Sequence, residues 1–97
     1  MTNIKKLLDD LGAPYDIQKI DGEECIHRIL DTGYEFEVSG TRKSSCTLYV
    51  WKVEPRTIVA IYQNIPVKSL KDILGYYATK YQNLTAQIQV EREDETI

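Results

Sequence analysis

The spacing of apolar residues changes twice along this chain, and that change constrains the fold more than any other feature. In Ile4–Leu11 apolar residues recur every three or four positions, which predicts one apolar stripe on a short helix. Over residues 15–65 the period is two, the period of a β-strand. The helical period returns over residues 70–81, where Ser69 and Asp72 form the capping-box pattern of a helix start.

Short turn sequences divide the middle region into candidate strands. Asp21-Gly22 and Asp31-Thr32-Gly33 are typical of tight hairpins, and Glu54-Pro55-Arg56 turns the chain again. The strands that result are Tyr15–Ile20, Cys25–Leu30, Tyr34–Ser39, Ser45–Val53 and Thr57–Ile65. The sequence therefore predicts an α+β fold, an antiparallel β-meander of four to five strands with an N-terminal helix and a C-terminal helix.

A second, weaker alternation follows the last predicted helix. In Thr85–Val90 apolar residues alternate with glutamines, which predicts a short final edge strand. An exposed edge there would let two copies pair, so a homodimer through this strand is an open alternative. The tail at about 91–97 is acidic and is expected to fray. No linker or internal repeat divides the chain, so residues 1–97 are predicted to form a single domain.

Composition and cysteine content indicate the class of protein and the compartment in which we expect it. The chain is 42% hydrophobic and 28% charged, an ordinary globular composition. Its longest apolar run, Ile58–Tyr62, is far shorter than the roughly 20 residues that span a bilayer. The N-terminus shows no secretory signal pattern, so we expect a cytoplasmic protein without a membrane partner. Cys25 and Cys46 are then predicted to be free thiols that pack within strands as small apolar residues.

Charge is unevenly distributed along the chain. Residues 15–40 hold seven acidic and two basic residues, whereas residues 41–80 hold seven basic and two acidic ones. A surface of one sign steers a partner by complementary charge, and the acidic candidates for it are Glu23, Glu24, Glu35 and Glu37. Three interpretations stay open: a solvated face, internal pairing with the basic half, or docking onto the basic surface of a larger protein.

Residues able to do chemistry are sparse. His27 is the only histidine, and Cys25 lies on the same face of its strand, the closeness that a thiolate–imidazole pair requires. No orienting residue or oxyanion-hole loop is identifiable. Cys25, His27 and Cys46 lack the usual zinc-ligand spacing, and no glycine-rich phosphate loop occurs. We therefore expect no enzymatic activity, no metal and no cofactor.

Aromatic and basic residues form the most informative group. Tyr49 and Trp51 share one strand face, and Tyr62 lies on the neighbouring strand. The basic residues that flank them are Arg42, Lys43, Lys52 and Arg56. If the first helix leaves this face open, the face offers a protein hot spot, rich in Trp, Tyr and Arg, or stacking positions for nucleic-acid bases. If the helix covers it, Tyr49 and Trp51 belong to the core.

These features favour a small non-enzymatic module that binds a protein partner through a polarised surface. That surface is either the acidic hairpin face or the aromatic and basic sheet face. The alternative is binding of single-stranded or structured nucleic acid through the Tyr49 and Trp51 face. This alternative predicts an affinity that falls steeply with salt, because phosphate contacts release counterions.

Overall fold

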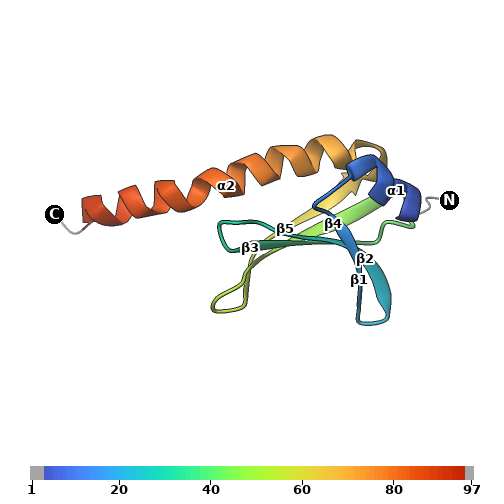
Figure 1. Cartoon of the computed structure of the whole chain (residues 1–97), viewed down its shortest axis with the longest axis horizontal. Coiled ribbons are helices and arrows are strands. Elements are labelled where there is room, and N and C mark those ends of the chain that lie inside the picture. The colour runs from blue at the N-terminus through green and yellow to red at the C-terminus, as the bar shows by residue number, and fades with distance from the viewer. Residues whose placement is uncertain (1–3, 96–97) are drawn as a thin grey trace.

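The computed structural model describes residues 4–95, with side chains described for residues 4–83. Its elements, in chain order, are α1 (Ile4–Leu11), β1 (Asp16–Ile20), β2 (Glu23–Ile29), β3 (Tyr34–Ser39), β4 (Ser45–Lys52), β5 (Thr57–Pro66), a 3-10 turn (Val67–Ser69) and α2 (Leu70–Glu95). This arrangement confirms the predicted α+β fold, with five strands between an N-terminal and a C-terminal helix (Figure 1).

Each strand pairs with the next one along the chain, so the sheet is antiparallel and has the order β1-β2-β3-β4-β5. The turn Asp21-Gly22 accounts for the first hairpin, because both residues have positive φ, 52° and 82°. That backbone is typical of a type I′ turn, whose twist matches the twist of paired strands. Glycine adopts it without strain, since it has no Cβ to clash.

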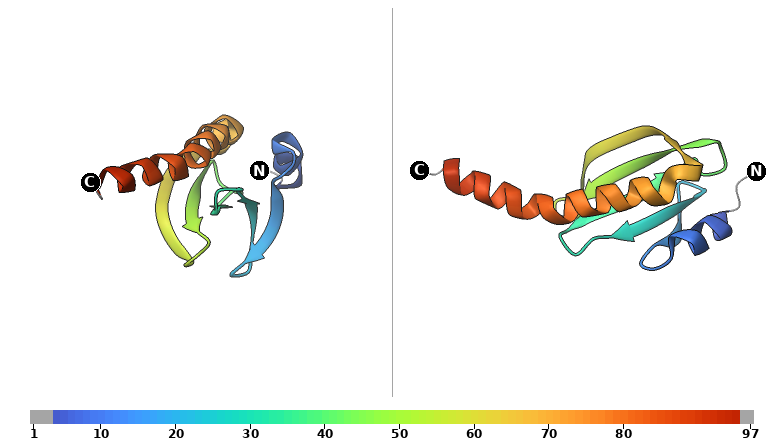
Figure 2. Two further views of the ribbon diagram at one scale, coloured as in Figure 1. Left: turned by 60° about the vertical axis from the view of Figure 1, so that its left-hand side comes forward. Right: turned by 90° about the horizontal axis from the view of Figure 1, so that it is seen from above.

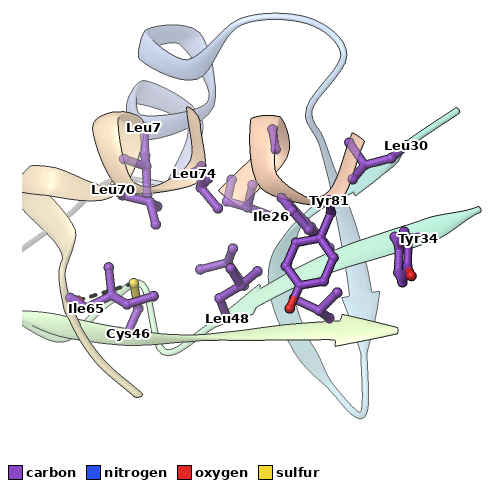
Figure 3. Close-up of a cluster of buried hydrophobic side chains, with 14 of the residues drawn as sticks. Leu7, Ile26, Leu30, Tyr34, Cys46, Leu48, Ile65, Leu70, Leu74 and Tyr81 are labelled. Atoms are coloured by element: carbon purple, nitrogen blue, oxygen red, sulfur yellow. Dashed lines mark hydrogen bonds between the residues drawn. The ribbon is translucent and has the colours of Figure 1, made fainter. Parts of the chain in front are cut away.

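Both helices lie on the same side of the sheet, as the two views in Figure 2 show. Leu70 and Leu74 of α2 face Ile65 and Leu48 of the sheet (Figure 3). The buried core between the layers comprises Leu7, Ile26, Leu30, Tyr34, Phe36, Val38, Cys46, Leu48, Val50, Ile65, Val67, Leu70, Leu74, Ala78 and Tyr81. Burying each large apolar side chain contributes about 1.5–3 kcal/mol, so this single core holds the two layers together.

The first helix adds its apolar stripe to that core. Leu7 is buried, and the other apolar residues of α1 pack against the same cluster. The helix ends at Gly12, whose φ of 74° lets its N–H donate to the carbonyl of Leu8 at 2.8 Å. Because α1 shares one core with α2, it leaves the opposite face of the sheet uncovered.

The predicted final strand, Thr85–Val90, is wrong: α2 continues without a break to Glu95. No glycine or proline separates this segment from the helix before it, and an alternation this short does not outweigh a helix already propagating. At 1.5 Å per residue the 26 residues of α2 span about 39 Å. The C-terminal part of α2 therefore extends beyond the sheet (Figure 1).

Two expectations for the C-terminal region change with this correction. A homodimer cannot use a strand at Thr85–Val90, because the edge strands of the sheet are β1 and β5. Of the acidic tail at about 91–97, residues 91–95 form the last part of α2, and residues 96–97 lie outside the described residues.

Candidate protein interface

The sheet face turned away from the helices carries two rows of side chains that cross the strands. The first row, from β2 to β5, is Ile29, Glu35, Trp51 and Ile58, and the second, from β1 to β5, is Asp16, His27, Glu37, Tyr49 and Ile61. We call these nine residues the open face. Among residues 4–95, no helix lies over them, so the alternative that the first helix covers Tyr49 and Trp51 is wrong. Tyr49 and Trp51 are half-buried.

Acidic groups at the centre of the open face are buried and paired. Glu35 and Glu37 are only 7% and 9% exposed, although each lies on the outer side of β3. The Nε2 of His27 lies 2.7 Å from Oε2 of Glu35, and its Nδ1 lies 3.2 Å from Oδ1 of Asp16. Only the imidazolium form has an N–H on each ring nitrogen, so only that form donates to both carboxylates.

Arg56, in the turn after β4, completes the ionic cluster. Its guanidinium donates to Oε1 of Glu35 and lies over the ring of Trp51, 4.4 Å from the ring centre. Burial alone raises the pKa of Glu35, but hydrogen bonds from Arg56 and His27 outweigh burial and hold that pKa below its usual range. Glu35 therefore stays ionised on a nearly dry surface.

Trp51 is fixed from two sides. Its indole Nε1 donates to Oε1 of Glu37 at 3.2 Å, and Arg56 stacks on its ring. The indole therefore has a set orientation on the sheet, with its polar atom satisfied.

The predicted acidic group does not form one surface. Glu35 and Glu37 belong to the open face, whereas Glu23 and Glu24 lie at the β1–β2 hairpin, near the β3–β4 loop. Oε2 of Glu23 accepts from the N–H of Gly40 at 2.7 Å, and Glu24 lies 4.0 Å from the guanidinium of Arg42. The acidic and basic halves of the chain thus pair internally at two places, Glu35 with Arg56 and Glu24 with Arg42.

The predicted aromatic and basic group also divides. Tyr62 lies on the helix side of the sheet, where its ring stacks on Tyr77 at 4.1 Å and its hydroxyl lies 2.6 Å from that of Tyr81. Tyr62 lies on the helix side because it is paired in register with buried Leu48, whereas its neighbour Ile61 is paired with Tyr49 of the open face. Tyr62 therefore does not share the sheet face of Tyr49 and Trp51.

The four basic candidates do not gather around Trp51. Arg42 and Lys43 lie in the β3–β4 loop, at the end of the sheet opposite to Arg56, and Lys52 is paired in register with core residue Tyr34. Only Arg56 contacts Trp51. The structure instead adds three exposed isoleucines that the sequence reasoning missed, Ile29, Ile58 and Ile61. The signal for two of them was present, because β5 is apolar on both faces.

The two side chains considered for catalysis, Cys25 and His27, contact other groups and not each other. The thiol of Cys25 donates to the carbonyl of Glu23 at 3.7 Å, while both nitrogens of His27 face carboxylates. Burial first, and then nearby acids, raise the pKa of Cys25 to about 11; burial also raises that of Cys46 to about 11. Both thiols are thus protonated near neutral pH. The described residues contain no cluster of three or more metal-ligating side chains.

No helix within the described part of the chain is both long and apolar enough to cross a membrane. No family model, no curated protein and no solved structure matches the chain.

Proposed function

We propose that this chain is a non-enzymatic cytoplasmic module whose open face docks onto a partner protein. The observation that carries the proposal is the composition of that face. Tyr49 and Trp51 lie beside Arg56 and are flanked by exposed Ile29, Ile58 and Ile61. Trp, Tyr and Arg are the residue types that dominate protein-interface energetics, and a ring of apolar neighbours excludes water around them.

The fixed orientation of Trp51 supports the same conclusion. An indole already held by Glu37 and Arg56 loses little conformational freedom when a partner covers it. Two interactions hold the indole in place, the hydrogen bond to Glu37 and the ion pair of Arg56 with Glu35. Both become stronger when a partner excludes water, because Coulomb interactions grow as the surrounding dielectric falls. Docking an apolar surface on this face therefore reinforces the contacts that shape it.

Charge favours a protein partner over nucleic acid. The open face carries three acidic groups, Asp16, Glu35 and Glu37. The basic groups described beside them already face these acids: Arg56 is paired with Glu35, and His27 contacts Glu35 and Asp16. A phosphate backbone would meet carboxylates there, and nucleic-acid affinity depends mainly on cations that contact phosphates. We therefore expect a partner surface with apolar side chains opposite the isoleucines and a basic side chain opposite exposed Asp16.

Capture of partners by variants of the full chain tests the proposal. The immobilised wild-type chain is compared with a Trp51→Ala/Ile29→Lys double variant, using lysate of the cells that make the protein. The matched control is Lys71→Ala, which shortens an exposed side chain on the helix side. Circular dichroism verifies that all three chains are folded.

We expect the wild-type chain and the Lys71→Ala variant to retain the same protein and the double variant to lose it. Equal capture by a folded double variant would contradict docking through the open face. Retention of nucleic acid by the wild-type chain, released by salt, would favour the alternative function.

A further inference from the structure

The two edges of the sheet differ in how they are protected against pairing. β1 is five residues long and carries Asp16 and Lys19, and charges of this kind keep exposed edges from pairing with other chains. β5 is ten residues long and contains no charged residue. Ile58, Val59 and Ile61 are exposed along it. β5 lacks charges, but its pairing with β4 is irregular on both sides of residues 60–62, Asn64 has a φ of 60° and the strand ends at Pro66. The regular part of this uncharged edge is therefore residues 60–62.

Ile58 and Ile61 belong to the open face, and on the helix side the apolar surface beside the β5 edge is formed by α2. Tyr76 of α2 is 66% exposed, and its ring packs edge-on against Tyr77 at 5.2 Å. Between the strand and the helix lies an open groove of about 560 Å³, lined on its helix side by Asp72, Ile73, Tyr76 and Tyr77. Exposed apolar residues grouped in this way mark an interaction site rather than a solvated surface.

We infer that this side of the molecule pairs with a second copy of the chain. In the homodimer, residues 60–62 of β5 lie antiparallel to the same residues of the partner subunit across a two-fold axis, and this pairing joins the two sheets. The two α2 helices then run antiparallel beside each other on the same face. Such an interface is isologous, so each patch must be complementary to itself.

Charge complementarity supports a second copy as the occupant. Asp72 lies four residues before Tyr76 and Lys80 four residues after it, so all three share one side of the helix. With the axis near Tyr76, Asp72 faces the partner's Lys80, and Lys80 faces the partner's Asp72. Both side chains are exposed, and the charged group of Lys80 lies about 6 Å from the rings of Tyr77 and Tyr81.

The strand and the helix can share that axis. The stacking of Tyr62 on Tyr77 places this part of α2 over the middle of β5, whose ten residues run from Thr57 to Pro66. A single two-fold axis near Tyr62 and Tyr76 therefore centres both the strand pair and the helix pair. Because β5 has no charged residue, the antiparallel strand pair brings no like charges together.

Sedimentation equilibrium over a range of protein concentrations tests the dimer directly. We expect the mass to approach twice the 11.2 kDa of one chain as the concentration rises.

Lys80→Glu turns two attractive pairs into repulsive ones and is expected to raise the dimer Kd about tenfold at low salt. Asp72→Lys combined with Lys80→Glu restores the pairs and returns the Kd toward that of the wild type. Lys71→Glu, an equal charge change at an exposed α2 position outside the groove, should leave the Kd unchanged.

Amide hydrogen exchange identifies the strand that pairs. We expect amides of β5 to gain protection as the concentration rises, while amides of the other edge strand, β1, do not. A chain that stays monomeric, a dimer that leaves β5 unprotected, or a double charge swap that fails to recover dimerisation in a folded protein would each overturn the inference. So would a β5 edge protected only by an extended segment of another protein.

Discussion

At the scale of single residues, Glu35 shows how a buried acid can be stable on an outer sheet face. It is nearly inaccessible to water, yet it accepts hydrogen bonds from His27 and Arg56. Hydrogen bonds to a charged group are stronger than neutral ones, and removing one partner leaves a buried group unsatisfied. Pairing, and not solvation, therefore keeps this carboxylate ionised.

Glu35→Gln is expected to lower the free energy of unfolding by about 1.5–3 kcal/mol at neutral pH, because charged hydrogen bonds are lost. The folded pKa of Glu35 is depressed, so its stabilisation is complete above the unfolded value, about 4.3. It is lost as the pH falls below that value toward the folded pKa. Urea unfolding at several pH values should show the stability difference between the two proteins narrowing in acid. A stability difference between the two proteins that stays constant with pH would contradict a depressed pKa for Glu35.

The two cysteines give a second expectation at this scale. Burial raises the pKa of Cys25 and Cys46 to about 11, and thiolates are the reactive form. At pH 8 a chromogenic disulfide reagent should react slowly with both thiols of the folded chain. In urea, where the chain is unfolded, both thiols should react completely. Rapid reaction of one thiol in the folded state would show that its strand opens readily.

At the scale of elements, periodicity predicted the strands well and the end of the last helix poorly. In Tyr34–Ser39 the alternation of apolar and polar residues is complete, and the structure places Phe36 and Val38 in the core. In Thr85–Val90 the same period covers only six residues, too few to distinguish a strand from an amphipathic helix. Helix propagation from Leu70 decided that segment, and propagation is a property of the whole element.

Gly75 gives a prediction for α2. A glycine inside a helix indicates either close packing or a weak position, and here a Cβ would meet nothing within 4 Å. Gly75→Ala should therefore raise the free energy of unfolding by about 0.5–1 kcal/mol, because alanine loses less backbone entropy. Thermal and urea unfolding measure the change. A less stable variant would mean that a neighbour approaches this turn of the helix.

At the scale of the whole molecule, the location of α1 decides what the sheet can do. Sequence reasoning identified Tyr49 and Trp51 as one strand face, and the register confirms that they share it. It could not tell which face α1 covers, because an apolar stripe packs equally well on either side of a sheet that is apolar on both. The burial of Leu7 with Leu70 and Leu74 settles this and leaves Trp51 on the open side.

The charge distribution is likewise explained only by the assembled fold. The acidic and basic halves looked like two surfaces in the sequence, but strand pairing and loops bring Glu35 to Arg56 and Glu24 near Arg42. Contacts between residues far apart in sequence cannot be read from local pattern. Part of the charge separation along the chain is therefore neutralised by ion pairs within the molecule.

Fluorescence of Trp51, the only tryptophan, tests most directly whether the open face is free and suited to protein. The full chain is titrated with acrylamide and, separately, with mixed single- and double-stranded oligonucleotides at low and moderate salt. We expect acrylamide to quench the emission and oligonucleotides to leave it unchanged, because the indole is half-buried beside carboxylates and no helix or strand of residues 4–95 lies over it. Emission that acrylamide cannot reach, or quenching by oligonucleotides that salt reverses, would contradict a protein-directed open face.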